Sequence, residues 1–279
     1  MPEATPAGPG QTPETAAIYL FCFAERGAVP AIEGPSLDDS YRVMQLTVED
    51  LAAVVSPVAV EQWTGPEAEA RLQDISWVGP RACRHEQVVE LVMRQSPVLP
   101  VRFGTMFSSR GSLETFVKKH RNIIQQFLDQ VADKDEWAVK GALDRPALKS
   151  KLLATLTAAE SPPLDSLPNG LRYLRESKIR AIADKEVNLW LKQWREKMAS
   201  GLIPCASDLR ELRARRCLDT GDRRDIILNW AFLVPRTSTA NFHSKVQQCN
   251  TEYLDRGLSL ETTGPWPPYS FCPSFPAES

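Results

Sequence analysis

Residues 226–234 read IILNWAFLV, an apolar run of β-branched, aromatic and aliphatic residues interrupted by one asparagine. This composition is typical of a buried strand. Residues 212–218, in which apolar residues alternate with arginines, predict a second strand, and residues 219–222 (DTGD) predict the turn that joins the two. We therefore expect a hairpin in this part of the chain.

The segments that flank the hairpin predict two helices and two further strands. Downstream, residues 238–256 carry one apolar face, Gly257 ends the helix, and residues 258–262 predict a last strand. Upstream, residues 136–141 (EWAVKG) predict a strand, and residues 171–199 predict a long charged helix after a proline-rich helical insertion. The resulting order is the βαββαβ arrangement of ferredoxin-like folds, a name that describes topology and implies no iron.

The first half of the chain predicts a smaller domain, also built of strands and helices. Residues 18–23, 41–48 and 52–58 predict strands, and residues 74–96 predict a helix that stops before Pro97. Residues 98–103 predict a fourth strand, and Ser112 is the expected cap of a helix that runs to residue 131. This half could be a degraded version of the βαββαβ plan.

The expected fold class is therefore α+β, with two domains. Residues 1–16 are rich in Pro, Thr, Ala and Gly and predict a disordered tail. Residues 17–131 form the smaller N-terminal α+β domain, and residues 132–263 form a modified ferredoxin-like βαββαβ sandwich with inserted helices. We expect residues 264–279, rich in proline and aromatic side chains, to form a tail that packs between the domains.

Composition excludes several functional classes. The 33 basic and 35 acidic residues leave a net charge of −2, so no strong overall field attracts nucleic acid or anionic lipid. No apolar run approaches the roughly 20 residues that a membrane span needs, and the first residues lack the basic segment of a secretory signal. The six cysteines are scattered without a C-x-x-C pair, which favours reduced thiols in a cytoplasm.

A search for catalytic motifs is negative. The chain contains no phosphate-binding P-loop, no dinucleotide-binding glycine motif and no nucleophile elbow. His85 and Glu86 begin like the zinc motif H-E-x-x-H, but Val89 stands where the second histidine is required. We therefore expect no enzyme activity, no catalytic residues, no cofactor and no metal site.

Nucleic acid is the alternative ligand to consider. Several arginines surround the predicted hairpin, and RNA-recognition domains share the βαββαβ topology. However, Trp230 and Phe232 lie in NWAFLV, outside the sequence context of an RNA-stacking motif. An edge strand protected by charge explains the arginines better.

Two segments have unusual composition. In residues 97–107 (PVLPVRFGTMF), Arg102 interrupts an apolar strand; if it is buried it needs a partner such as Glu86. In residues 263–271 (TGPWPPYSF), prolines fix an extended backbone, so the aromatic rings can dock at low entropic cost, either on this chain or in a partner's groove.

Together these segments resemble the GvpF/GvpL family of gas vesicle accessory proteins, and the tail resembles that of the GvpF members. The resemblance covers residues 18–271, and each motif is weak alone. The residues that carry it, and that we expect to be structural or interaction residues, are Arg84, His85, Glu86, Pro100, Arg102, Phe103, Gly104, Trp137, Trp230, Pro265, Trp266, Pro267, Pro268, Tyr269 and Phe271.

The resemblance implies a function in building the gas-filled protein shell. It implies a cytoplasmic, gas-vesicle-associated protein without enzyme activity that binds the small hydrophobic shell protein GvpA and other gas vesicle accessory proteins. Such a protein acts as an assembly factor or stays in the shell as a minor component. The resemblance implies no cofactor, no nucleic acid and no membrane partner.

Overall fold

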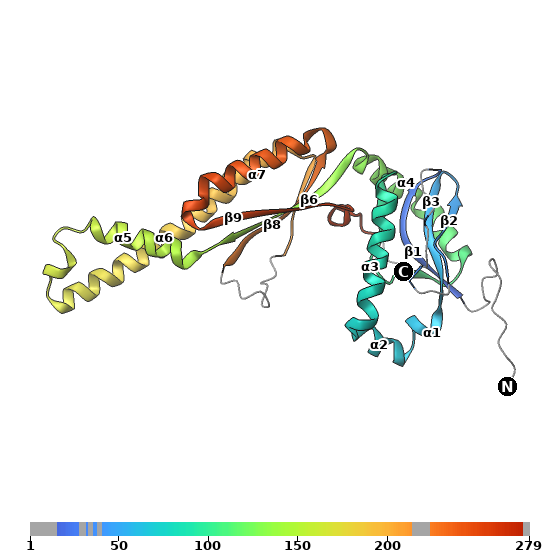
Figure 1. The fold of residues 1–279 in the computed structure, drawn as a ribbon, viewed down its shortest axis with the longest axis horizontal. Helices are drawn as coiled ribbons and strands as arrows, with labels where there is room; N and C mark the ends of the chain where they lie inside the picture. Colours follow the sequence, from blue (N-terminus) through green and yellow to red (C-terminus); the bar gives the residue numbers. More distant parts are fainter. Residues whose placement is uncertain (1–15, 28–31, 33–35, 38–40, 214–223, 276–279) are drawn as a thin grey trace. The chain divides into compact units, whose positions relative to one another are not determined.

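The computed structural model describes residues 16–27, 32, 36–37, 41–213 and 224–275. It divides into two compact units (Figure 1). Unit 1 contains the chain up to Asp133 and the tail from Trp266, and unit 2 is Lys134–Pro265. Each unit has its own antiparallel sheet, which confirms the predicted α+β class. The predicted tail of residues 1–16 lies outside the described residues except for Ala16.

The sheet of unit 1 is built around one buried strand, β1 (Ala16–Glu25). The strand order is β2-β3-β1-β4, and β5 also pairs with β1. β1 and β3 are buried along nearly their whole length, which explains why both segments are continuously apolar rather than alternating. The remaining strands are β2 (Met44–Val48), β3 (Leu51–Ala59), β4 (Val98–Pro100) and β5 (Met106–Phe107).

Two long helices cover opposite faces of this sheet. Tyr19 and Phe21 of β1 contact His85 of α3 (Ile75–Met93). Phe23 stacks on Phe116 of α4 (Arg110–Val131) on the other face. The pairing of β1 with β3 shifts between Leu20 and Cys22, a bulge that changes which side chains face α3. Two short helices, α1 (Val60–Trp63) and α2 (Pro66–Gln73), precede α3.

Helix α4 begins earlier than the sequence suggested. Ser109, and not Ser112, is the N-cap residue: its hydroxyl accepts a hydrogen bond from the Ser112 amide at 3.1 Å. The Ser112 hydroxyl in turn accepts a hydrogen bond from the Ser109 amide at 3.2 Å. The two serines therefore form a reciprocal capping box, so the expected cap residue is its third helical position.

Replacing Ser109 with Ala should lower the free energy of unfolding by about 1 kcal/mol, because the Ser112 amide loses the hydroxyl oxygen that accepts its hydrogen bond. Urea unfolding measures this change. Ser238→Ala is the matched control, since Ser238 precedes α7 without making a side-chain cap bond. Equal effects of the two substitutions would contradict the assignment of the cap.

Unit 2 has the predicted ferredoxin-like topology. Its strand order is β7-β8-β6-β9, with β8 antiparallel to both β6 and β7. An inserted helix pairs with the long helix between the first two strands. The elements are β6 (Lys134–Leu143), α5 (Arg145–Ala158), α6 (Asn169–Leu202), β7 (Asp208–Glu211), β8 (Asp225–Pro235), α7 (Thr239–Tyr253) and β9 (Leu258–Trp266).

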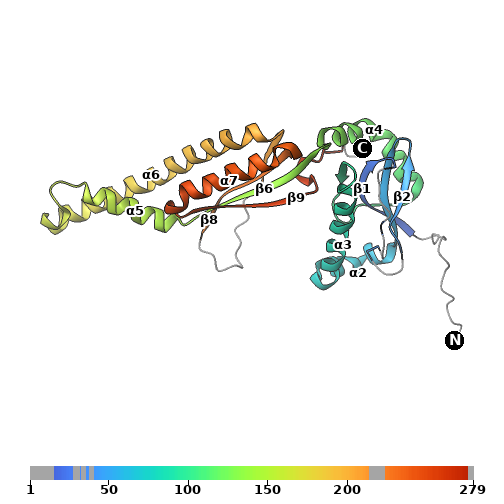
Figure 2. The same ribbon diagram turned by 45° about the horizontal axis from the view of Figure 1, so that its top comes forward.

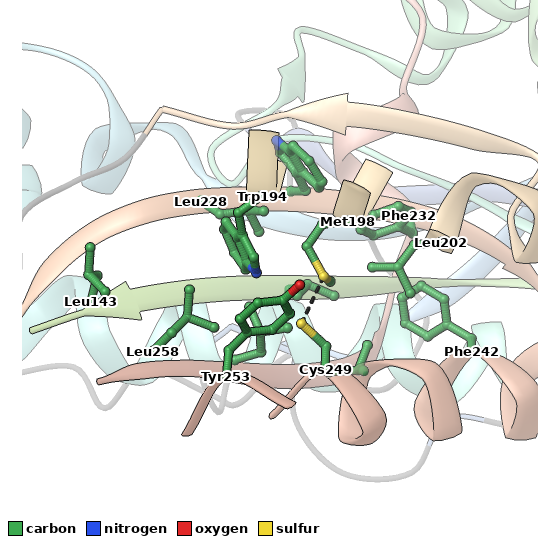
Figure 3. Packing of buried hydrophobic residues seen from close by; sticks show 14 of the residues in the cluster. Leu143, Trp194, Met198, Leu202, Leu228, Phe232, Phe242, Cys249, Tyr253 and Leu258 are labelled. Atoms are coloured by element: carbon green, nitrogen blue, oxygen red, sulfur yellow. Dashed lines mark hydrogen bonds between the residues drawn. The ribbon is translucent and has the colours of Figure 1, made fainter. Parts of the chain in front are cut away.

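The core of unit 2 lies between the sheet and helices α6 and α7, which cover the same face (Figure 2). Side chains from α6, from α7 and from the strands point toward one another there, and the Cys249 thiol lies 2.9 Å from the Met198 sulfur (Figure 3). The central strand contributes every second side chain to this core: Leu228, Trp230, Phe232 and Val234. The strand IILNWAFLV is thus the centre of the sheet.

The described part of the strand that pairs with β8 begins earlier than the predicted partner. The hairpin partner was expected at residues 212–218, of which 214–218 lie outside the described residues, and β7 is Asp208–Glu211. Helix α6 continues to Leu202 and is followed by a single 3₁₀ turn, so the chain enters the sheet earlier. β7 is short and charged and therefore lacks the apolar run that signals a strand. The predicted turn at residues 219–222 lies outside the described residues.

The two units share one strand order. Numbered along the chain within each unit, the order across the sheet is 4-1-3-2 in both: β4-β1-β3-β2 and β9-β6-β8-β7. Unit 2 places α5 and α6 between its first two strands, whereas in the described residues of unit 1 no helix lies between β1 and β2. The strand order confirms the interpretation of the first half as a reduced version of the same plan.

Candidate functional site

A buried hydrogen-bond network joins β1, α3 and the loop after β4. His85 Nδ1 lies 2.8 Å from the Tyr19 hydroxyl, and His85 Nε2 lies 3.1 Å from the Val101 carbonyl oxygen. A carbonyl only accepts, so Nε2 carries the proton and Nδ1 accepts from Tyr19. The Gly104 amide donates to the same hydroxyl at 3.1 Å. Every polar atom of this Tyr19–His85 network therefore has a partner.

Burial keeps both rings of the network neutral. It lowers the pKa of His85 to about 4, against a weaker opposing effect of the Val101 hydrogen bond. Burial also raises the pKa of Tyr19 far above its usual value. A histidine that stays neutral and whose two nitrogens are both occupied is not available as a general base. The network is a structural one.

The tail is fastened next to this network. The Tyr269 hydroxyl donates to Glu86 Oε2 at 2.9 Å, and the Cys272 thiol donates to the Pro100 carbonyl at 3.4 Å. Burial, followed by the nearby Glu86 carboxylate, raises the pKa of Tyr269. Burial is also the main cause that raises the pKa of Glu86. Three of the motifs quoted from the sequence, around Glu86, Pro100 and Tyr269, therefore meet in unit 1.

The low pKa of His85 predicts a specific pH dependence of stability. The folded state binds the proton more weakly than the unfolded chain, so stability is present above pH 6.5 and is lost as the pH falls toward 4. Between pH 7 and pH 5 this loss amounts to about 2 kcal/mol of unfolding free energy.

Urea unfolding of the wild type and of His85→Gln at several pH values measures this effect. Glu86, whose raised pKa acts in the opposite direction, is present in both proteins, so the difference between the curves isolates His85. The wild type should lose more stability than the variant on acidification, and parallel curves would contradict the assignment.

A cavity of about 530 Å³ lies beside the network, on the α4 side of the sheet. Its walls come from β1, from β4 and the loop after it, from α4, and from the tail. The lining is mostly apolar, and Arg102 is the only charged residue among the described residues that line it. They are Leu20, Phe23, Leu99, Pro100, Val101, Arg102, Thr105, Phe107, Phe116, Tyr269, Cys272, Pro273, Ser274 and Phe275. We call this space the tail cavity.

The loop after β4 differs from its prediction. The strand expected at residues 98–103 ends at Pro100, and residues 101–105 bulge out before pairing resumes at β5. Arg102 is consequently exposed at the cavity rather than buried in a strand, and Glu86 bonds Tyr269 instead of Arg102. The predicted ion pair between them was wrong. Phe103 packs on Trp63, and Gly104 adopts a positive φ of 86° at the turn.

The two other tryptophans of the motifs belong to unit 2, where Trp230 lies in the core and Trp137 packs against it. Trp137 packs edge-on against His243, with ring centroids 4.3 Å apart. Trp230 is 5% exposed and packs on Phe232, which is fully buried on the helix-covered face. Neither Trp230 nor Phe232 is available to stack a base, which is a further argument against RNA binding by this sheet.

The remaining motif residues lie in the tail or beside His85. Pro265 and Trp266 end β9, and Trp266 is 41% exposed. Pro267 and Pro268 are buried, and Phe271 is 5% exposed, so these three pack as an internal anchor. Arg84 precedes His85 on α3. The placement of the tail between the domains stays a prediction.

Sequence reasoning missed three residues of this site. Tyr19, the centre of the network, is hidden in an apolar strand and no motif marks it. Phe275, which packs on Phe116 and His120, and Cys272 lie after the last recognised motif. The detectable signal was the polar hydroxyl in an otherwise apolar run, since a buried Tyr needs a hydrogen-bond partner.

The described residues contain neither a candidate metal site nor a candidate membrane-spanning helix. No group of three or more His, Cys, Asp or Glu side chains in the described part of the chain is placed to hold a metal ion. Among the helices within those residues, none combines the length and apolarity that a bilayer crossing requires.

A family model and two curated relatives all point to the same family of gas vesicle proteins. The family model described as gas vesicle synthesis protein GvpL/GvpF matches residues 17–273. Gas vesicle protein L of a Streptomyces species is 24% identical over 225 residues, which cover 80% of each chain. Gas vesicle protein L2 of Halobacterium salinarum is 24% identical over 266 residues, which cover 91% of each chain.

Solved structures show the same fold. The crystal structure of gas vesicle protein GvpF from an Anabaena species matches 93% of this chain and 99% of its own, with a TM-score of 0.68 and 17% identity. GvpF from Microcystis aeruginosa matches 92% of this chain and 99% of its own, with a TM-score of 0.61 and 16% identity. At this identity the likeness concerns the fold alone.

Proposed function

The chain belongs to the gas vesicle synthesis family GvpL/GvpF, and from this premise we propose that it is a non-enzymatic accessory protein that binds the small hydrophobic shell protein GvpA during gas vesicle assembly. The family match over residues 17–273 carries the proposal. The Tyr19–His85 network supports the non-enzymatic part, since its polar groups are fully occupied by the fold.

The apolar character of a gas-filled shell favours a role in covering its subunits before assembly. A shell that excludes water needs strongly apolar subunits, and such subunits aggregate unless their apolar surfaces or strand edges are covered before assembly. Unit 1 offers two surfaces of the required kind. One is the edge strand β2, where Met44 is 43% exposed, and the other is the tail cavity.

Co-expression with GvpA tests the proposal. We expect this protein, carrying an affinity tag, to retain GvpA in the soluble fraction, and deletion of its gene in the producing cell to abolish vesicles. GvpA that is equally soluble with and without this protein, and is not retained by it, would count against the proposal. Immunodetection on washed vesicles then separates a transient assembly factor from a minor shell component.

A further inference from the structure

Arg102 is a cation at the wall of the tail cavity. Its guanidinium makes no hydrogen bond or ion pair with any residue that the structure describes, and its side chain is exposed. Around it the tail cavity is lined by aromatic and aliphatic side chains, including Leu99, Phe107 and Phe116. A cation beside apolar walls is complementary to a ligand that joins a carboxylate to bulky apolar groups.

Backbone hydrogen bonds fix the position of Arg102 in the loop after β4. The preceding residue is held by two bonds: the Val101 amide donates to the Phe21 carbonyl at 3.2 Å and the Val101 carbonyl binds His85. The Arg102 carbonyl itself accepts hydrogen bonds from the Thr105 amide and hydroxyl. The Tyr19–His85 network thus holds the backbone that presents this arginine at the cavity.

One wall of the cavity comes from the end of the described tail. Residues 272–275 of the tail have neither helical nor strand structure, and Phe275 inserts its ring against Phe116 and His120, with centroids 5.1 and 5.2 Å away. The site therefore already accommodates an aromatic side chain from a segment without helical or strand structure. Its volume of about 530 Å³ falls within the roughly 300–1,000 Å³ of typical ligand sites.

We propose that the tail cavity binds an extended segment of a partner polypeptide in which an acidic side chain lies next to bulky apolar side chains. Arg102 binds the carboxylate, and the aromatic walls of the cavity hold the apolar side chains. This proposal deepens the proposed function, on which it rests for the idea that the occupant is a polypeptide.

Two peptides that differ only in charge test the proposal. The probes are acetyl-Phe-Leu-Glu-Phe-amide and acetyl-Phe-Leu-Gln-Phe-amide, and dodecanoate serves as a carboxylate without a peptide. Binding is measured by calorimetry to the full chain. Loss of one charge-assisted bond should weaken binding about tenfold, so the Glu peptide should bind about ten times more tightly than the Gln peptide.

Two variants make the test specific. In Arg102→Gln the preference for the Glu peptide should disappear, and in Arg102→Lys part of it should return. Arg110→Gln is the matched control, because Arg110 is an exposed arginine of α4 that pairs with Glu114 and does not line the cavity. It should bind both peptides like the wild type.

Two results with these probes would overturn the proposal, and the co-expression experiment separates its failure from that of the proposed function. Equal binding of the two peptides to the wild type would show that Arg102 does not bind the carboxylate. Binding of dodecanoate but of neither peptide would show that the ligand is not a polypeptide. If the Glu peptide binds as expected but GvpA is not retained in co-expression, the site stands and the proposed function fails. If GvpA is retained but neither peptide binds, the function stands and this site falls.

Discussion

Replacing Tyr19 with Phe should lower the free energy of unfolding by about 3 kcal/mol, although it removes one oxygen atom. The hydroxyl donates to His85 Nδ1 and accepts from the Gly104 amide, and Tyr19 is fully buried. In the variant the buried His85 Nδ1 and the half-buried Gly104 amide both lose this partner, and each unsatisfied buried group costs roughly 1–3 kcal/mol. Urea unfolding gives the total change, and hydrogen exchange should show faster exchange of the Gly104 amide.

Tyr173→Phe is the matched control for this substitution. Tyr173 lies on α6 and is 68% exposed, so its variant should change stability by less than about 0.5 kcal/mol. If Tyr19→Phe is as harmless as this control, the network does not hold the loop after β4 and the structural interpretation of His85 fails.

Replacing Gly264 with Ala should lower the free energy of unfolding by about 3 kcal/mol or more, at least as much as Tyr19→Phe. Gly264 has a φ of 137°, a region that other residues rarely adopt, and strain of this kind costs roughly 1–3 kcal/mol. An added Cβ would lie 2.8 Å from the Glu136 carbonyl oxygen and 3.0 Å from the Trp137 ring. Because one of these atoms belongs to the backbone of β6, the strand itself would have to move.

Gly27→Ala separates strain from close contact. Gly27 also has a positive φ, of 80°, but nothing lies within 4 Å of the position that an added Cβ would take, so its variant should lose only about 1 kcal/mol. Thermal unfolding compares the two variants. Similar losses at the two positions would show that the approach of β9 to β6 tolerates a side chain.

The fold was largely predictable because its central strands are strongly apolar. The run IILNWAFLV and the segment 18–23 lie in central strands of their sheets. Such strands are recognised from their continuous apolar residues. The edge strand β7 (Asp208–Glu211) was not predicted, for the opposite reason. A short edge strand exposes charged side chains and needs no apolar pattern, so tertiary pairing alone determines where it lies.

The candidate site was only half predictable. The motifs around Glu86, Arg102 and Tyr269 could be recognised as unusual, but which of them touch depends on contacts between residues far apart in the chain. Glu86 was matched with Arg102 by charge, whereas the fold places the Tyr269 hydroxyl on its carboxylate. The assumption that Arg102 is buried failed because the chain bulges out of the sheet after Pro100.

The most direct test of the account is a crosslinking experiment in cells that produce GvpA. A photoreactive residue is placed at Thr105, which lines the tail cavity, or at Tyr173, which is exposed on α6. We predict that the first position crosslinks GvpA and that the second does not. Vesicle-forming cells in which neither position, or only position 173, crosslinks GvpA would contradict the claim that unit 1 binds the shell protein.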